Sequence, residues 1–156
     1  MECHASPTAG TSCWYGIPAG IVPSSGKVLD SPQLADTGLA LQVCILEKLK
    51  SFGHEPLVVD SSQLLRNPRS VLSQLCGRLD LAFEEEMLSW PAGPKPEDGV
   101  WASHWYASSH RTTGFLPYSP GHAPLPECLQ PLLQECLPYY AELRRHAIEA
   151  EQEDVP

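Results

Sequence analysis

Basic and aromatic side chains alternate along one irregular stretch of the chain, residues 80–115. Four basic side chains are interleaved there with three tryptophans: Lys95, His104, His110, Arg111, Trp90, Trp101 and Trp105. Prolines and glycines break any helical or strand period across the middle of the stretch, which predicts a long loop. Loops that carry such side chains on a rigid scaffold are common binding sites, although a surface loop pinned to the core by its tryptophans has the same composition.

Composition limits the ligands that such a loop could take. The chain has 156 residues, the length of one domain, and its 42% hydrophobic and 19% charged residues are typical of globular proteins. Its net charge of −9 argues against nucleic acid as a partner. A local basic pocket could still bind a small phosphorylated ligand. No membrane span or signal peptide is recognisable, so we expect a cytoplasmic protein with reduced thiols.

Two short patterns imitate known sites without meeting their requirements. The segment GIVPSSGKV, residues 20–28, resembles a phosphate-binding P-loop, but five residues separate its glycines where the motif needs four. Val28 also lacks the hydroxyl that would bind magnesium. Cys3, His4 and Cys13 could be read as a metal cluster, but the six cysteines form no CxxC pair. We therefore predict neither a P-loop nor a metal site.

The elements that must position the loop follow the order of an α/β domain. The apolar run of residues 55–60 predicts a strand covered on both faces. Asp60 at its carboxyl end is either a site residue or the cap of the following turn, 61–65. Helical periodicity predicts longer helices over residues 36–50, 67–79 and 126–151, and Asp36 should cap the first of these and Asn67 the second. Pro138 should kink or split the last of these helices.

The remaining segments give weaker indications. Residues 1–20 show no period and are rich in small residues, so a poorly ordered or unrelated tail is expected there. Residues 84–88 should form a short helical turn, and residues 149–156 an acidic tail. Cys44 and Cys76 fall among apolar residues of predicted helices, which favours small core residues at both positions.

Three pieces of the sequence together resemble the C-terminal half of P-loop sulfotransferase-like proteins. They are LVVDSSQLLRNPRSVLSQLCGRL, EMLSWPAGPKPEDGVWASHWY and HRTTGF. The similarity is greatest to a branch known from bacteria, algae and plants, in which some plant proteins join this domain to an aminotransferase-like domain. The resemblance implies part of an α/β domain with the P-loop NTPase fold. We expect it to be mostly helical, with one or few parallel strands and long loops.

The resemblance also implies a chemistry. Family members that are enzymes transfer a sulfuryl group from 3′-phosphoadenosine 5′-phosphosulfate to a hydroxyl or an amine. An N-terminal strand–loop–helix cradles the 5′-phosphosulfate, and an Arg and a Ser farther along contact the 3′-phosphate. A late loop, patterned with a basic residue, glycines and a tryptophan, closes over the nucleotide.

The late loop of the family resembles residues 95–105. Lys95, Gly99 and Trp101 match its residue types. Lys95 could neutralise phosphate as a point charge, and Gly99 would let the backbone approach an anion. Trp101 could pack on the nucleotide or on the core. Arg111, in the HRTTGF piece, could pair with a phosphate or with a carboxylate of the core.

The 3′-phosphate segment of the family is only partly matched. Ser24, in IVPS, corresponds to its serine, but the arginine expected a few positions earlier is replaced by residues 15–18, YGIP. The phosphate-cradling loop and the region of the usual catalytic base have no counterpart. His104 and His110 are polar groups near the late loop, yet nothing in the motif makes either of them the base.

We therefore expect a truncated, sulfotransferase-like, nucleotide-binding protein that is inactive alone because it lacks the phosphate-binding loop. Its donor substrate would be 3′-phosphoadenosine 5′-phosphosulfate, with no nucleic acid or membrane partner. The alternative is a non-catalytic interaction module that docks to a partner supplying the missing half. The buried strand should take its neighbours mainly from that half, which would promote self-association or binding of a protein partner. In this view residues 1–20 are the tail, 21–148 the domain and 149–156 the acidic tail.

Overall fold

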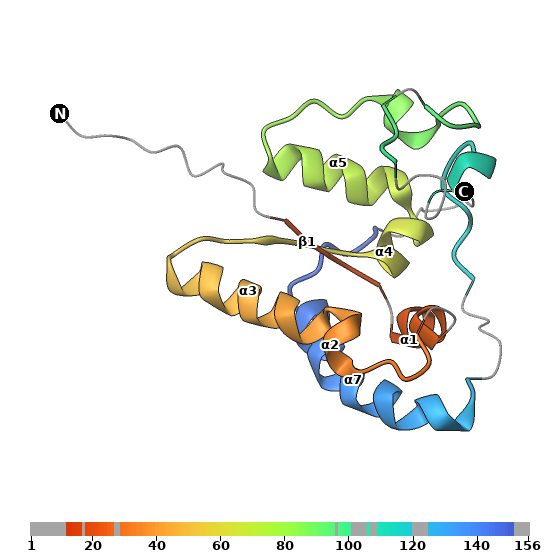
Figure 1. The fold of residues 1–156 in the computed structure, drawn as a ribbon. Coiled ribbons are helices and arrows are strands. Elements are labelled where there is room, and N and C mark those ends of the chain that lie inside the picture. Colours follow the sequence, from red (N-terminus) through yellow and green to blue (C-terminus); the bar gives the residue numbers. More distant parts are fainter. Residues whose placement is uncertain are drawn as a thin grey trace.

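The fold is built around two short strands that pair in parallel. The computed structural model describes these parts of the chain: residues 12–16, 18–26, 29–95, 97–100, 106, 109–119 and 125–151. Strand β1 (Ser12–Tyr15) lies beside β2 (Leu57–Asp60), with Cys13 opposite Val58. The expected parallel pairing is therefore present in a mostly helical α/β domain (Figure 1).

Helices cover both faces of this sheet (Figure 1). One layer contains α1 (Pro18–Gly26), α2 (Leu34–Thr37), α3 (Leu39–Ser51) and α7 (Gln130–Arg144). The opposite face is covered by α5 (Pro68–Arg78), which follows β2 through the short helix α4 (Ser61–Arg66). The described 3-10 turns are η1 (Glu85–Leu88), η2 (Ser109–Arg111) and η3 (Glu127–Leu129). The turn at η1 confirms the one predicted over residues 84–88.

The side chains of β2 alternate between two hydrophobic clusters, one on each face of the sheet. Val58 packs with buried residues of α1, α3 and α7. Leu57 and Val59 point the other way and pack with Val71 and Leu75 of α5. All four residues of β2 are buried. The apolar run thus does what its pattern predicts, because a strand between two helical layers needs apolar side chains on both faces.

β2 has a neighbour on each of its edges. Besides β1, the extended segment after α7 runs beside it, and Val58 forms a parallel bridge with Ala147. The Ile148 N–H donates to the Val58 carbonyl at 2.9 Å. The expectation that β2 takes its neighbours mainly from a missing half is therefore wrong. Within the described parts of the chain, β1 pairs with β2 alone, so β1 carries the open edge.

The first regular elements begin earlier than the sequence predicts. No element is expected before Gly20, yet β1 covers Ser12–Tyr15 and α1 begins at Pro18. The four residues SCWY have no apolar period of their own, and it is their pairing with β2 that makes them a strand. The division into a tail, a domain and an acidic tail stays a prediction, since residues 1–11 and 152–156 lie outside the described residues.

The predicted helix over residues 36–50 is in fact two helices. Gly38, with a φ of 71°, ends α2 in the left-handed conformation, and α3 starts directly after it. The Gln33 N–H donates to the Asp36 carboxylate at 2.8 Å, so Asp36 caps α2 and not the longer helix. The expectation that Cys44 is a core residue is wrong, because its side chain is exposed on α3, whereas Cys76 is buried as predicted.

The two caps predicted around α4 and α5 are present. Asp60 accepts a hydrogen bond from the Ser62 N–H at 2.8 Å and begins α4. Asn67 accepts one from the Ser70 N–H at 3.0 Å and begins α5, with Pro68 at its first turn. These side chains satisfy backbone donors that a helix start leaves unpaired.

α7 continues through Pro138 as one helix, so the predicted split does not occur. Leu132, Cys136 and Leu143 form its buried stripe. Beyond the helix, residues 149–151 are not a free tail, because the Ala150 N–H donates to Gln63 and the Glu151 N–H to Ser70, each at 3.1 Å. No helix in the described residues has the length and apolar character that crossing a membrane would need.

Candidate functional site

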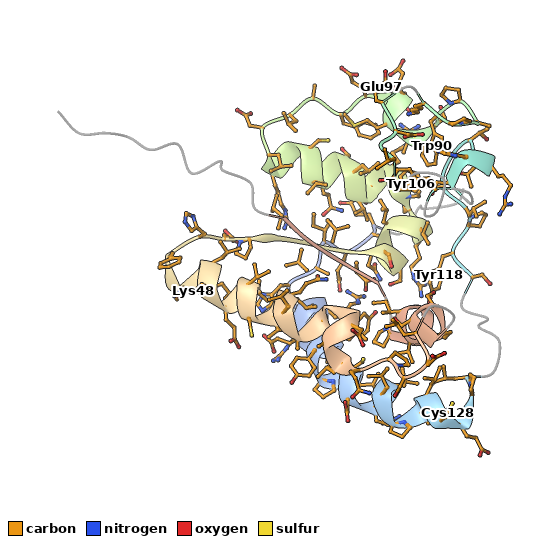
Figure 2. All side chains as sticks on the ribbon, in the orientation of Figure 1. Lys48, Trp90, Glu97, Tyr106, Tyr118 and Cys128 are labelled. Atoms are coloured by element: carbon orange, nitrogen blue, oxygen red, sulfur yellow. The ribbon has the colours of Figure 1, made fainter. Side chains whose placement is uncertain are left out.

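A cavity of about 450 Å³ lies at the carboxyl end of the sheet. β1 turns into α1 and β2 turns into α4 at this end, which is where ligands collect in parallel α/β sheets. Hydroxyl groups dominate its polar lining: Ser24 from α1, Ser61 and Ser62 from α4, and Tyr118 and Ser119 from the segment after the late loop. Figure 2 shows Tyr118 beside α4 and α1. Most of the exposed lining surface is nevertheless apolar, so the hydroxyls are a few polar groups in an apolar cavity.

Ser24 is the predicted site residue that lies in this cavity. Its hydroxyl donates to the Gly20 carbonyl at 2.8 Å, which leaves the oxygen lone pairs able to accept a hydrogen bond. Ser25, its neighbour, donates in the same way to the Ile21 carbonyl at 3.1 Å. Ser25 does not line the cavity, so the two serines differ in access to a ligand and not in helix geometry.

Gly16 lines the same cavity at the turn between β1 and α1. A Cβ at this position would lie 3.3 Å from the Ile21 side chain and 3.4 Å from the Ser61 hydroxyl. A side chain at position 16 would therefore point toward the cavity. No cationic side chain lines the cavity among the described residues, so its hydrogen-bonding groups there are neutral.

Asp60 lies at the end of β2 near the cavity, but it is buried and is not accessible to a ligand. Its side chain is fully buried, and it accepts from the Tyr140 hydroxyl at 3.0 Å as well as from the start of α4. The Arg144 Nε lies 3.4 Å from the same carboxylate. Burial, with the charge of Asp60 nearby, raises the pKa of Tyr140. These contacts tie α4 and α7 to the end of β2, and they favour the capping interpretation of Asp60.

The late loop is held by a separate network. The Lys95 N–H donates to the Asp98 carboxylate at 2.8 Å, and His110 Nε2 lies 2.8 Å from the same oxygen. The Gly93 N–H donates to the His110 carbonyl at 2.8 Å. Asp98 therefore joins the start of the loop to the HRTTGF piece, next to Arg111.

Trp90 joins the two ends of the stretch 80–115. Its ring packs edge-to-face on Phe115, with centroids 5.3 Å apart, and its Nε1–H donates to Thr112. Ser89 forms an antiparallel bridge with Gly114. These partners all lie within residues 80–115, so Trp90 holds the two ends of this stretch together, and its pinning to the core stays a prediction.

Three of the other predicted residues lie outside the cavity. Lys95, Gly99 and Arg111 are exposed, and the lining of the cavity does not include them. In Figure 2 Glu97, which follows shortly after Lys95, lies beyond α5, on the far side from α1. Trp101 and His104 lie outside the described residues. Roles for these residues in nucleotide binding stay predictions.

The arrangement has a counterpart in a known family. A family model described as "Sulfotransferase domain" matches residues 12–147. The chain belongs to the sulfotransferase domain family. The match begins with β1 and ends with the segment beside β2, so it spans the sheet and both helical layers. The family expected from the sequence motifs is confirmed.

Two plant relatives of this sulfotransferase domain are similar over most of the chain. Branched-chain-amino-acid aminotransferase-like protein 1 of Arabidopsis thaliana is 41% identical over 129 residues, and protein 2 of the same plant is 39% identical over 129 residues. Each match covers 83% of this chain but only 23% of the relative. The domain thus occurs in plant proteins named aminotransferase-like, as the resemblance implies. No solved structure matches the chain.

The cavity of this sulfotransferase domain includes residues that sequence analysis does not identify. Tyr118 and Ser119 give no motif signal, because they follow the matched HRTTGF piece and reach the cavity only through the path of the chain. The sequence does contain a signal that could have identified Ser61 and Ser62 as site residues. They directly follow Asp60, which the sequence already places at the carboxyl edge of the sheet, where α/β sites collect.

The Asp98 network predicts a pH dependence of the late loop. The Lys95 N–H, together with His110, holds the pKa of Asp98 below its ordinary value. A carboxylate with a lowered pKa stabilises the folded loop above its unfolded-state pKa, and this stabilisation is lost as the pH falls through the folded-state pKa. We expect the Lys95 amide signal in NMR spectra to shift during acid titration below the ordinary pKa of Asp. Asp98→Asn should abolish the shift, whereas Glu97→Gln should retain it; persistence in Asp98→Asn would contradict the assignment.

Proposed function

We propose that this sulfotransferase domain binds the 3′-phosphorylated end of an adenosine nucleotide weakly and does not transfer a sulfuryl group alone. One observation carries the proposal: Ser24, the residue that matches the family's 3′-phosphate serine, lies with other hydroxyl groups in a largely apolar cavity at the carboxyl end of a parallel sheet. The serine hydroxyls can donate to phosphate oxygens once rotated toward them.

Weak binding follows from the charge of the lining. A hydrogen bond to a charged group contributes about 1.5–3 kcal/mol, more than a neutral pair does. The family's arginine would supply such bonds, but residues 15–18 contain no basic side chain. The sites of Lys95 and Arg111 lie outside the cavity lining, and a movement of the late loop would be needed to bring Lys95 to the phosphate.

The lack of transfer follows from the segment that imitates a P-loop. Residues 20–26 are part of helix α1, so their N–H groups are not arranged as a loop around a phosphate. A P-loop acts through backbone N–H groups and a lysine that stabilise the charge on the transferring group. Removing one oxyanion donor raises a reaction barrier by about 2.7–4 kcal/mol in known enzymes. Without the whole set, turnover of 3′-phosphoadenosine 5′-phosphosulfate by this chain should be undetectable.

Calorimetric titration with adenosine 3′,5′-bisphosphate tests the site. We expect weak binding to the unmodified chain, and binding weaker still by about fivefold or more in Ser24→Ala, because one hydrogen bond to a charged phosphate is lost. Ser25→Ala is the matched control, since it removes the same type of hydroxyl from the same helix but outside the cavity. Equal affinity of all three proteins would exclude Ser24 as a phosphate ligand.

A second variant adds to the cavity the positive charge that the family's arginine would supply. Gly16→Arg places a guanidinium at a residue that lines the cavity, and the neighbouring Ile21 side chain must move by a few tenths of an ångström. We expect about tenfold tighter binding of adenosine 3′,5′-bisphosphate, and no comparable gain for adenosine 5′-monophosphate, which lacks the 3′-phosphate. A gain of equal size for both nucleotides would show that the charge acts without a 3′-phosphate site.

The second candidate function is a non-catalytic interaction module. It is favoured by the open edge of β1, which leaves backbone groups available for another strand within the described parts of the chain. A partner strand, or a second copy of the domain, would protect the β1 amides from hydrogen exchange. Protection that rises with protein concentration would indicate self-association. A cytoplasmic location is part of this proposal and follows from the sequence expectations alone.

A further inference from the structure

We propose that a groove beside the Ser24 cavity binds a small monocarboxylate carried on an apolar body, with Arg66 as the group that recognises the carboxylate. The groove has a volume of about 1080 Å³ and is separate from the proposed phosphate site. Leu65 and Tyr118 line both, so the two spaces adjoin across these side chains. A volume of this size suits a small organic ligand.

Arg66 lies in the groove with its guanidinium stacked on an aromatic ring. The guanidinium carbon is 4.3 Å from the centroid of the Tyr118 ring. Attraction between the cation and the ring holds the guanidinium in place, and its N–H donors form a fixed planar fork. A guanidinium held in place can donate two parallel hydrogen bonds to a carboxylate. Tyr118 therefore prepares Arg66 for a planar anion.

Arg66 also differs from nearby arginines in its partners. Arg69, on the next helix, pairs with Glu85 and also lies over an aromatic ring, that of Phe83, at 6.0 Å. Arg144 pairs with Asp60 and Glu149. Arg66 has no carboxylate within ion-pair distance among the described residues. An anion from solution can therefore bind Arg66 without displacing an ion pair of the described domain.

The two amide side chains of the groove and its second arginine, Arg144, already have partners. Asn67 caps α5 and donates to the Glu151 carbonyl, and Gln63 accepts from the Ala150 N–H. The charge of a ligand is left to Arg66. Glu151 also lines the groove with an exposed side chain, which would repel a second negative charge. A single carboxylate fits this balance better than a phosphate does.

The opposite wall of the groove is apolar. It is formed by the consecutive residues Phe115, Leu116 and Pro117, and the Leu116 side chain is 64% exposed. Burying such a wall under an apolar ligand is favourable in proportion to the area removed from water. Of the two arginines that line the groove, Arg144 is already paired with Asp60 and Glu149. Arg66 and the apolar wall together define the ligand class.

NMR titration of the whole chain with small probes tests the proposal. We expect benzoate to shift the Arg66 Nε–H signal and the Tyr118 ring signals. Benzamide has nearly the same shape without the charge, and acetate has the charge without the ring, so both should bind at least about tenfold more weakly. Inorganic phosphate should also bind more weakly than benzoate. Equal binding of benzoate and benzamide, or no shift with benzoate, would overturn the proposal.

Matched variants then assign the site. Arg66→Gln should weaken benzoate binding by about tenfold or more, because the charge-assisted bonds are lost. Arg69→Gln is the control and should change it by less than about twofold, since that guanidinium is already paired. Tyr118→Leu should weaken binding by removing the stacking platform. Benzoate affinity that survives Arg66→Gln would overturn the proposal. Ser24→Ala should leave benzoate binding unchanged, so the outcome is independent of nucleotide binding.

Discussion

Asp60→Ala is expected to lower the free energy of unfolding by about 2–4 kcal/mol, the first of the two largest effects that we predict. The carboxylate is fully buried and serves partners on α4 and α7, namely the Ser62 N–H, the Tyr140 hydroxyl and the Arg144 guanidinium. Its removal leaves buried donors without an acceptor, and an unsatisfied buried donor costs about 1–3 kcal/mol. Arg144 retains Glu149 and is half-buried, which limits its share of the loss.

Urea unfolding measures this effect. Asp30→Ala is the control, because Asp30 is exposed, and it should change the free energy of unfolding by less than about 0.5 kcal/mol. Tyr140→Phe removes one donor while Asp60 keeps its other partners, so we expect a smaller loss of about 1 kcal/mol. A double-mutant cycle of Asp60→Ala with Tyr140→Phe should show coupling, since the two side chains are in contact. Strict additivity would show that the hydrogen bond contributes nothing to stability.

Ile148→Ala is expected to destabilise the domain by about 2–4 kcal/mol, although Ile148 lies after the last helix. Its side chain is 1% exposed and packs with Leu57, Val59, Val71 and Leu75 under α5. Truncation removes buried methyl groups and leaves a cavity in that layer. The same residue holds the second edge of β2 through its N–H, so the loss should also loosen this pairing.

Hydrogen exchange separates the two consequences. In the unmodified chain the Ile148 amide, which donates to the Val58 carbonyl, should exchange slowly, and Ile148→Ala should raise its exchange rate more than that of the α7 amides. Leu41→Ala is the control for loss of apolar side chain, because Leu41 is 64% exposed on α3, and it should cost less than about 0.5 kcal/mol. Rapid exchange of Ile148 in the unmodified chain would mean that the segment does not pair with β2 in solution.

Features set by neighbouring residues are the ones that the sequence predicts well. The buried strand 57–60 follows from an unbroken apolar run, and the caps Asp60 and Asn67 follow from short polar side chains at helix starts. These signals are local, because a cap bonds a backbone group two or three residues away. The sequence also identifies the family, because its motifs are recognisable without knowledge of any contact. The family match confirms this assignment.

Features that depend on distant partners are decided by the tertiary structure alone. Residues 12–15 are a strand because β2 offers a free edge, and residues 147–148 occupy the other edge for the same reason. Neither segment has a hydrophobic period that predicts a strand, because pairing depends on a free strand edge nearby more than on the residue types of the segment. Likewise, the serines of α1 and α4 meet Tyr118 in one cavity, while Lys95 and the other described residues of the late loop do not line it. A motif fixes residue types along the chain, but which of them share a site depends on how strands and helices pack in space.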